Sequence, residues 1–212
     1  MVATLTRSVG TASGQKDDSS QGPPPVDESV DRRTQYKNEI VILVSAPLVA
    51  EDLSPIEGLA IQKEVDEIVS IIEDLEADIA IEVTVKIATT ESLLQIFAQN
   101  FRPAIIHFIG HGIRTDQGIA LLLEDAVGRA RPFTSEDLKN LLANRLYPPC
   151  SLALLNACHS EGLADSLIDA GVPHIVAVNA EDEVLDVAAR SFSRHFYQAL
   201  FNEYPIIDAF YH

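Results

Sequence analysis

Two residues of this sequence have the chemistry and the local setting of a nucleophile and its base. Cys158 follows the apolar segment 151–157, and His111 lies between two glycines directly after the apolar segment 104–109. The thiolate is the reactive form of cysteine, and a neighbouring imidazole can take up the thiol proton during attack. The sequence therefore predicts a Cys–His pair that attacks a carbonyl carbon.

The same two positions offer hydrogen-bond donors for the oxyanion that such an attack creates. Gly112 has no side chain to cover its backbone N–H, and Cys158 lies just before a helix expected from Glu161. Helix N-termini and exposed backbone N–H groups stabilise developing negative charge. We expect the backbone N–H groups of Gly112 and Cys158 to bind the oxyanion.

The elements around these residues alternate between strands and helices. Short runs rich in β-branched residues predict buried strands, and apolar residues at helical spacing predict amphipathic helices. Thr89 or Thr90 and Thr134 are suited to cap two of the helices. We expect strands at 39–46, 80–87, 104–109, 151–157 and 174–179, a short strand or hairpin arm at 118–125, and helices at 56–77, 91–100, 135–146, 161–170 and 183–201.

This alternation indicates an α/β fold, an open and mostly parallel sheet with helices on both faces. In such sheets the working residues gather beyond the carboxyl ends of the strands. His111 and Cys158 follow two successive strands of this kind, 104–109 and 151–157. If the two strands are neighbours, the side chains can meet at one edge of the sheet.

The remaining cysteine and the other histidines fit structural roles better. Cys150 comes after two prolines and before a strand, where a cysteine usually serves as a small hydrophobic residue. His107 lies within a strand and is expected to pack inward, and His159 is a second-choice contributor beside Cys158. No phosphate-binding glycine loop, GxSxG elbow or zinc-ligand spacing occurs. We expect no cofactor and no metal.

Composition limits the classes of partner. The chain has 212 residues, with 32 acidic and 15 basic residues and a net charge of -17, which disfavours binding to nucleic acid. Its apolar runs are too short to span a membrane. Two cysteines without a secretory leader indicate a reducing compartment, and we expect a cytoplasmic protein. Residues 1–38 are rich in Gly, Ser, Pro and Asp and predict a disordered tail or linker, followed by one domain over 39–212.

Four motifs, in order, resemble the CHAT domain, a branch of the caspase-like cysteine peptidases related to separase. They are HFIGHG at 107–112, NACHS at 156–160, AGVPHIVAV at 170–178 and the helix DVAARSFSRHFYQAL at 186–200. The 47 residues from His111 to Cys158 are close to the ~50 of caspases. The resemblance covers residue 39 to the end and implies a caspase-like sheet. Family members usually continue through a last helix beyond PIIDAFYH, which leaves open that the chain is truncated there.

The resemblance implies a His111–Cys158 dyad and a cysteine endopeptidase acting on a protein or peptide substrate, with an activating partner or a neighbouring sensor or repeat domain. The alternatives are a catalytically silent signalling or scaffold module that binds protein partners, and a thiol enzyme acting on small molecules. Acidic residues in loops at the carboxyl edge predict a pocket for basic side chains. Asp182 is the first candidate for that pocket, with Glu161 and Asp116 as further candidates.

Overall fold

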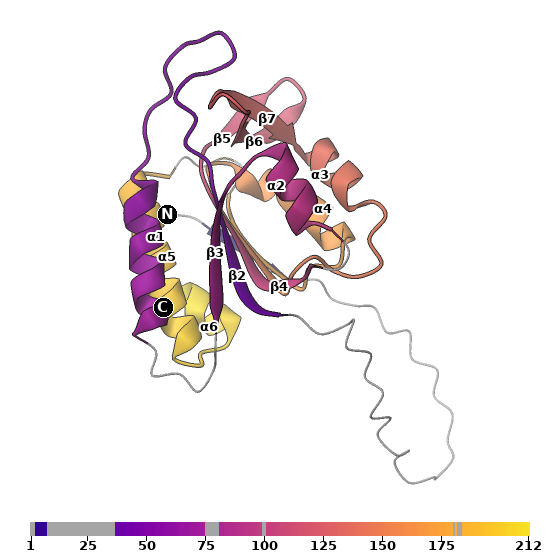
Figure 1. The fold of residues 1–212 in the computed structure, drawn as a ribbon. Helices are drawn as coiled ribbons and strands as arrows, with labels where there is room; N and C mark the ends of the chain where they lie inside the picture. The colour runs from indigo at the N-terminus through magenta and orange to yellow at the C-terminus, as the bar shows by residue number, and fades with distance from the viewer. Residues whose placement is uncertain (1–2, 8–36, 75–80, 99–100, 180, 182–183) are drawn as a thin grey trace, which may run out of the picture.

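A computed structural model describes residues 3–7, 37–74, 81–98, 101–179, 181 and 184–212 of the chain. Its strands and helices alternate along most of the sequence (Figure 1). The elements are β1 (Ala3–Arg7), β2 (Lys37–Val44), α1 (Ile61–Glu73), β3 (Glu82–Ile87), α2 (Thr90–Ile96), β4 (Pro103–Ile109), β5 (Gly112–Thr115), β6 (Gly118–Glu124), β7 (Ala130–Thr134), α3 (Ser135–Leu142), β8 (Leu152–Asn156), the 3-10 helix η2 (Ser160–Leu163), α4 (Ala164–Asp169), β9 (His174–Val178), α5 (Asp186–Phe201) and α6 (Ile206–Tyr211).

The main sheet has six strands in the order β1-β9-β8-β4-β2-β3. The five strands from β9 to β3 are parallel, and β1 alone runs antiparallel, along β9. The central strands are buried on both faces, as their continuous apolar runs predict. The α/β fold with a mostly parallel sheet is confirmed. Strands β4 and β8 are direct neighbours, with Ile109 in register with Asn156.

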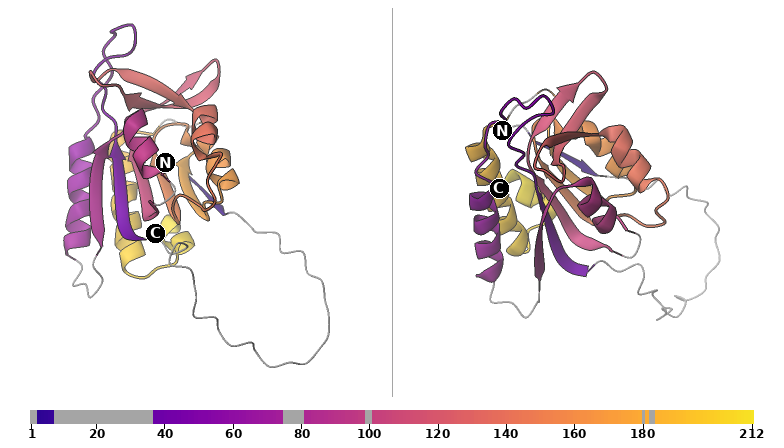
Figure 2. Two further views of the ribbon diagram at one scale, coloured as in Figure 1. Left: turned by 45° about the vertical axis from the view of Figure 1, so that its right-hand side comes forward. Right: turned by 45° about the horizontal axis from the view of Figure 1, so that its top comes forward.

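Two helical layers cover the two faces of this sheet. Helices α1, α5 and α6 pack on one face, and α2, α3 and α4 pack on the other (Figures 1 and 2). Each face has its own apolar core, one centred on residues such as Ile42, Ile68 and Phe196 and the other on residues such as Leu43, Phe108 and Leu155. A sheet covered in this way holds the ends of its central strands rigidly.

A second, three-stranded sheet follows β4 directly and has the order β5-β6-β7. The sequence predicts only its central strand, at 118–125, because β5 and β7 are short and carry few apolar residues. The capping box predicted at Thr134 is confirmed: the Thr134 hydroxyl accepts from the Asp137 N–H, and the Asp137 carboxylate accepts from the Thr134 N–H. Thr89 likewise caps α2.

The N-terminal strand differs from the expected tail. Residues Ala3–Arg7 pair antiparallel with His174–Val178 of β9, so this part of 1–38 belongs to the sheet. The alternating residues ATLTR are too few to give a strand signal on their own, and their partner lies far away in the sequence. The remainder of the predicted tail up to residue 36 lies outside the described residues.

Several helices are shorter than the periodicity predicts, because some of the residues predicted as helix lie in the adjoining loops. Helix α1 begins at Ile61 rather than at residue 56, and Pro55 and Gly58 lie in the loop before it. Val49 in that loop forms bridges with Pro55 of the same loop and with Arg129, and the Ala130 N–H of β7 donates to the Val49 carbonyl at 2.8 Å. The C-terminal segment PIIDAFYH holds helix α6, whose Ala209 is buried against the α1–α5 core.

Candidate active site

His111 lies at the carboxyl end of β4, immediately before β5, as predicted. Its ring nitrogen Nε2 lies 2.8 Å from the carbonyl oxygen of Glu57, in the loop before α1. A carbonyl can only accept a hydrogen bond, so Nε2 carries the proton and donates it. In the neutral ring this leaves Nδ1 as the nitrogen with a free lone pair, which is the form a general base needs.

Cys158 lies in the tight turn between β8 and η2. The next residue, His159, has a left-handed backbone with φ of 60°, which reverses the chain after the strand. The buried Ser160 then fixes the turn: its hydroxyl donates to the Leu155 carbonyl at 2.8 Å and accepts from the Val178 N–H at 3.0 Å. These two bonds attach the cysteine turn to both β8 and β9.

The backbones of Gly112 and Cys158 touch each other. A Cβ atom placed on Gly112 would lie 1.9 Å from the Cys158 carbonyl oxygen and 3.3 Å from its backbone nitrogen, so only glycine fits there. The Leu122 N–H donates to the His111 carbonyl at 2.9 Å, which directs the N–H of the following residue, Gly112, away from β6. The glycine therefore lets the two strand ends come together.

His111, Gly112 and Cys158 line one open cleft of about 530 Å³ at the carboxyl edge of the sheet. The thiol is part-buried and accepts a hydrogen bond from the Val184 N–H, with 3.4 Å between the two heavy atoms. Within the described residues the hydrogen bonds of the thiol go to Val184 and not to His111. Catalytic hydrogen bonds are often long before substrate binds, so this arrangement is compatible with a dyad.

The acidic residues that line the cleft are not the three named from the sequence. They are Glu57 in the loop before α1, Glu64 of α1 and Asp186 of α5. The structure does not bring Glu161 or Asp116 to the cleft, and Asp182 lies outside the described residues. Glu64 carried a sequence signal, because it falls on the apolar face of its helix, four residues before Ile68 and three after Ile61.

A buried polar cluster supports the floor of the cleft. Glu64 is 1 % exposed, and its Oε1 accepts from the Asn156 amide and from the Ser193 hydroxyl, each at 2.6 Å. Burial raises the pKa of the Glu64 carboxyl. The hydrogen bonds from Ser193 and Asn156 lower that pKa, but their effect is smaller than that of burial. The cluster joins α1 and α5 to the end of β8, two residues before Cys158.

His107 extends this cluster into the core, and its predicted inward packing is confirmed. The side chain is fully buried, and its Nδ1 lies 3.3 Å from the Tyr197 hydroxyl. Its Nε2 lies 3.7 Å from Glu64 Oε1. Burial lowers the pKa of His107 to about 3, so the ring is neutral and contributes shape rather than charge.

Cys150 lies in the apolar core, as predicted. It is fully buried, and burial raises the pKa of its thiol to about 12. A thiol in this position carries almost no thiolate near neutral pH, which makes it unreactive. The two cysteines therefore differ sharply in access: one faces the cleft and the other is enclosed.

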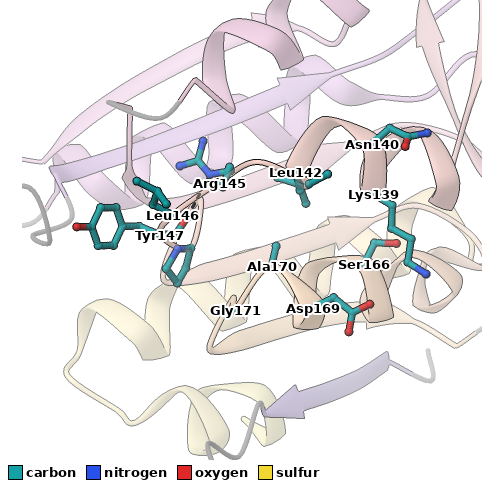
Figure 3. Close-up of a pocket in the computed structure, with 12 residues that line it drawn as sticks. Lys139, Asn140, Leu142, Arg145, Leu146, Tyr147, Ser166, Asp169, Ala170 and Gly171 are labelled. Carbon is teal, nitrogen blue, oxygen red and sulfur yellow. Dashed lines mark hydrogen bonds between the residues drawn. The ribbon is translucent and has the colours of Figure 1, made fainter.

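A second hollow, of about 590 Å³, lies between the end of α3 and the end of α4 (Figure 3). Lys139, Tyr147 and Asp169 line it, together with Arg145, whose guanidinium donates to the carbonyl oxygens of Phe97 and Ala98. Neither His111 nor Cys158 contributes to it.

No group of three or more His, Cys, Asp or Glu side chains in the described part of the chain could hold a metal ion. No helix in the described segments is both long and apolar enough to cross a membrane.

The comparison with protein families agrees with the motifs. The CHAT domain family model matches residues 4–210. The chain belongs to the CHAT domain family. The match begins within β1, so the N-terminal strand lies inside the matched region.

Comparisons with individual proteins add less. No curated protein matches the sequence. Among solved structures, the Drosophila initiator caspase Dronc is similar, with 13% sequence identity and a TM-score of 0.31. That match covers 73% of this CHAT chain and 63% of the caspase chain, so the chain spans less than two thirds of that protein.

Proposed function

We propose that this CHAT domain is a cysteine endopeptidase in which Cys158 is the nucleophile and His111 the base. The observation that carries the proposal is the shared cleft: two residues 47 positions apart, with the residue types of a thiol dyad, line one cavity at the carboxyl edge of the sheet. Membership of a family related to caspases supports the same chemistry.

The proposed reaction begins with attack of the Cys158 sulfur on the scissile carbonyl carbon. The S–C bond forms while His111 Nδ1 takes the thiol proton, and the C–N bond then breaks as His111 gives this proton to the leaving amine. Water hydrolyses the resulting thioester and regenerates the thiol. The Glu57 carbonyl keeps the imidazole in the tautomer that this proton transfer requires.

The oxyanion would be stabilised by the backbone N–H groups of Gly112 and Cys158. Support comes from the contact between their backbones and from the direction of the Gly112 N–H, away from β6. Two fixed donors in a partly enclosed site are worth about 10²–10³-fold in rate each.

The proposed substrate is a protein segment with a basic residue near the scissile bond. Glu64 and Asp186 line the cleft of a chain with a net charge of -17, and a negative potential increases the encounter rate of cationic side chains. Asp186 pairs with Arg190 at 3.3 Å, so a bound cation would exchange with that arginine. A peptide library compared between wild type, Asp186→Asn and Asp182→Ala tests this preference. A preference for acidic residues in the wild type would reject it.

The experiment that tests the activity is labelling with an electrophilic peptide probe, combined with cleavage of a peptide library. We expect Cys158→Ala to abolish labelling and cleavage, and the enclosed Cys150 to remain unlabelled. Cys150→Ala is the matched control and should retain both. An unlabelled Cys158 in a folded chain would instead favour the alternative, a silent CHAT module that binds protein partners.

A further inference from the structure

The outer edge of strand β3 is complementary to itself. The sheet ends at β3, and in Figure 1 this strand lies in front of β2, with α1 to its left and α2 to its right. Its central residues read Glu82-Val83-Thr84-Val85-Lys86, a sequence symmetric about Thr84 in residue size and opposite in charge at its ends.

The hydrogen-bond pattern shows which backbone groups of β3 point outward. The Ala88 N–H donates to the Val44 carbonyl of β2 at 2.7 Å. Backbone groups alternate along a strand, so Thr84 and the other even-numbered residues direct their N–H and C=O towards β2. Val83 and Val85 direct theirs outward, where no described residue of the chain bonds to them.

The outer edge also carries uncovered apolar and charged groups. Val85 is 45 % exposed and Ile87 56 % exposed, although Ile42, the neighbour of Val85 on β2, is fully buried and Val44, the neighbour of Ile87, packs against the same core. Neither Glu82 nor Lys86 forms an ion pair with any residue that the structure describes. Such an edge is a template for another strand.

We propose that a second copy of this chain binds here, with the two β3 strands antiparallel across a two-fold axis at Thr84. In that register Val83 faces Val85 of the second copy, and their outward N–H and C=O groups form a hydrogen-bonded pair on each side of the axis. Two observations agree on this register: the odd-numbered residues of β3 direct their backbone groups outward, and the sequence is symmetric about Thr84.

Charge complementarity favours a second copy over an unrelated strand. In the same register Glu82 lies opposite Lys86 of the second copy, and Lys86 opposite its Glu82, both at closely spaced non-hydrogen-bonded positions. A lysine on an edge strand normally repels added strands. Here the symmetric glutamate neutralises it for one partner only, which is this chain. The sheets of the two copies would then form one continuous sheet. Because each copy contributes only one edge strand, the buried interface would be small, and we expect the association to be weak and reversible.

The proposal is independent of catalysis, because β3 contributes no residue to the cleft. The test is the mass of the full chain in solution, by sedimentation equilibrium up to about 1 mM. We expect a concentration-dependent rise towards twice the 23.1 kDa of one chain. A chain that stays monomeric over this range overturns the proposal, even if it binds other strands.

Charge variants test the register. Glu82→Lys or Lys86→Glu alone places like charges opposite each other and should weaken association about tenfold or more. The double variant carrying both substitutions should regain association, and so should a mixture of the two single variants. Equal association of all these proteins would place the contact elsewhere and overturn the proposal.

A backbone variant tests the hydrogen bonds. Val85→Pro removes an outward N–H without touching the bonds to β2, a position where edge strands tolerate proline. We expect it to be monomeric, and Val85→Ala to associate within a few-fold of wild type. Circular dichroism establishes that the variants are folded. If Val85→Pro does not fold, the charge series still decides the question. A folded Val85→Pro that associates as wild type does contradicts the proposed pairing.

Discussion

Replacing Gly112 by alanine tests whether the contact between the two strand ends is essential to the site. The added methyl carbon would lie 1.9 Å from the Cys158 carbonyl oxygen, and real Cβ atoms essentially never approach closer than 3.0 Å. The atoms it meets are backbone atoms, which cannot rotate away as a side chain could. The Cys158 turn must therefore move by about 1 Å, at the atoms that would bind the oxyanion.

A misplacement of about 1 Å at reacting groups can cost about 10²-fold in rate. We expect Gly112→Ala to lower kcat/KM for peptide cleavage by about 10²-fold or more. Overpacking should also cost about 1–3 kcal/mol of the free energy of unfolding, so the assay must be run well below the melting temperature.

The matched control for this substitution is Gly58→Ala. Gly58 also lines the cleft, but a Cβ atom there would have no atom within 4 Å, so the added methyl should displace no backbone atom and should lower kcat/KM far less than Gly112→Ala does. A folded Gly112→Ala protein with wild-type activity would refute the reasoning, because the site would then tolerate separation of the two strand ends.

Three further predictions concern single groups. His111→Ala should lower the cleavage rate about 10²–10⁴-fold with an unchanged melting temperature, whereas Glu57→Ala should keep full activity because only its backbone carbonyl is used. Glu64→Gln should be more stable than wild type at pH 7 and equal to it near pH 4, measured by denaturant unfolding, because a carboxyl with a raised folded-state pKa loses stability as pH rises. Ser160→Ala should cost about 1–3 kcal/mol in the same assay, since the buried Val178 N–H loses its acceptor.

The sequence predicts the central strands of the sheet well because each one can be recognised from its own short segment of sequence. Segments such as 104–109 and 151–157 are continuous apolar runs, and the strands they form are neighbours whose ends carry His111 and Cys158. The order of the strands follows from short connections and parallel pairing. The convergence of the two residues on one cleft could therefore be predicted from their positions alone.

What sequence reasoning missed depends on backbone atoms and distant pairings. The carbonyl of Glu57 that holds His111 has no residue-type signal, because every residue has a carbonyl. Strands β1 and β9 pair although most of the chain separates them in sequence, and the five alternating residues of β1 carry no signal that identifies β9 as their partner. Glu64 was detectable as a charged residue on an apolar helix face, but its role needs the positions of Asn156 and Ser193, which only the fold supplies.

Because only one of the two thiols is accessible, the native chain can be labelled selectively with a spectroscopic probe. With Cys150 enclosed in the core and Cys158 in the cleft, a maleimide dye or nitroxide should attach at one defined position without first building a cysteine-free background. A label there reports on the occupancy of the cleft. In an associated pair of chains, two such labels would also give a direct interchain distance by dipolar spectroscopy.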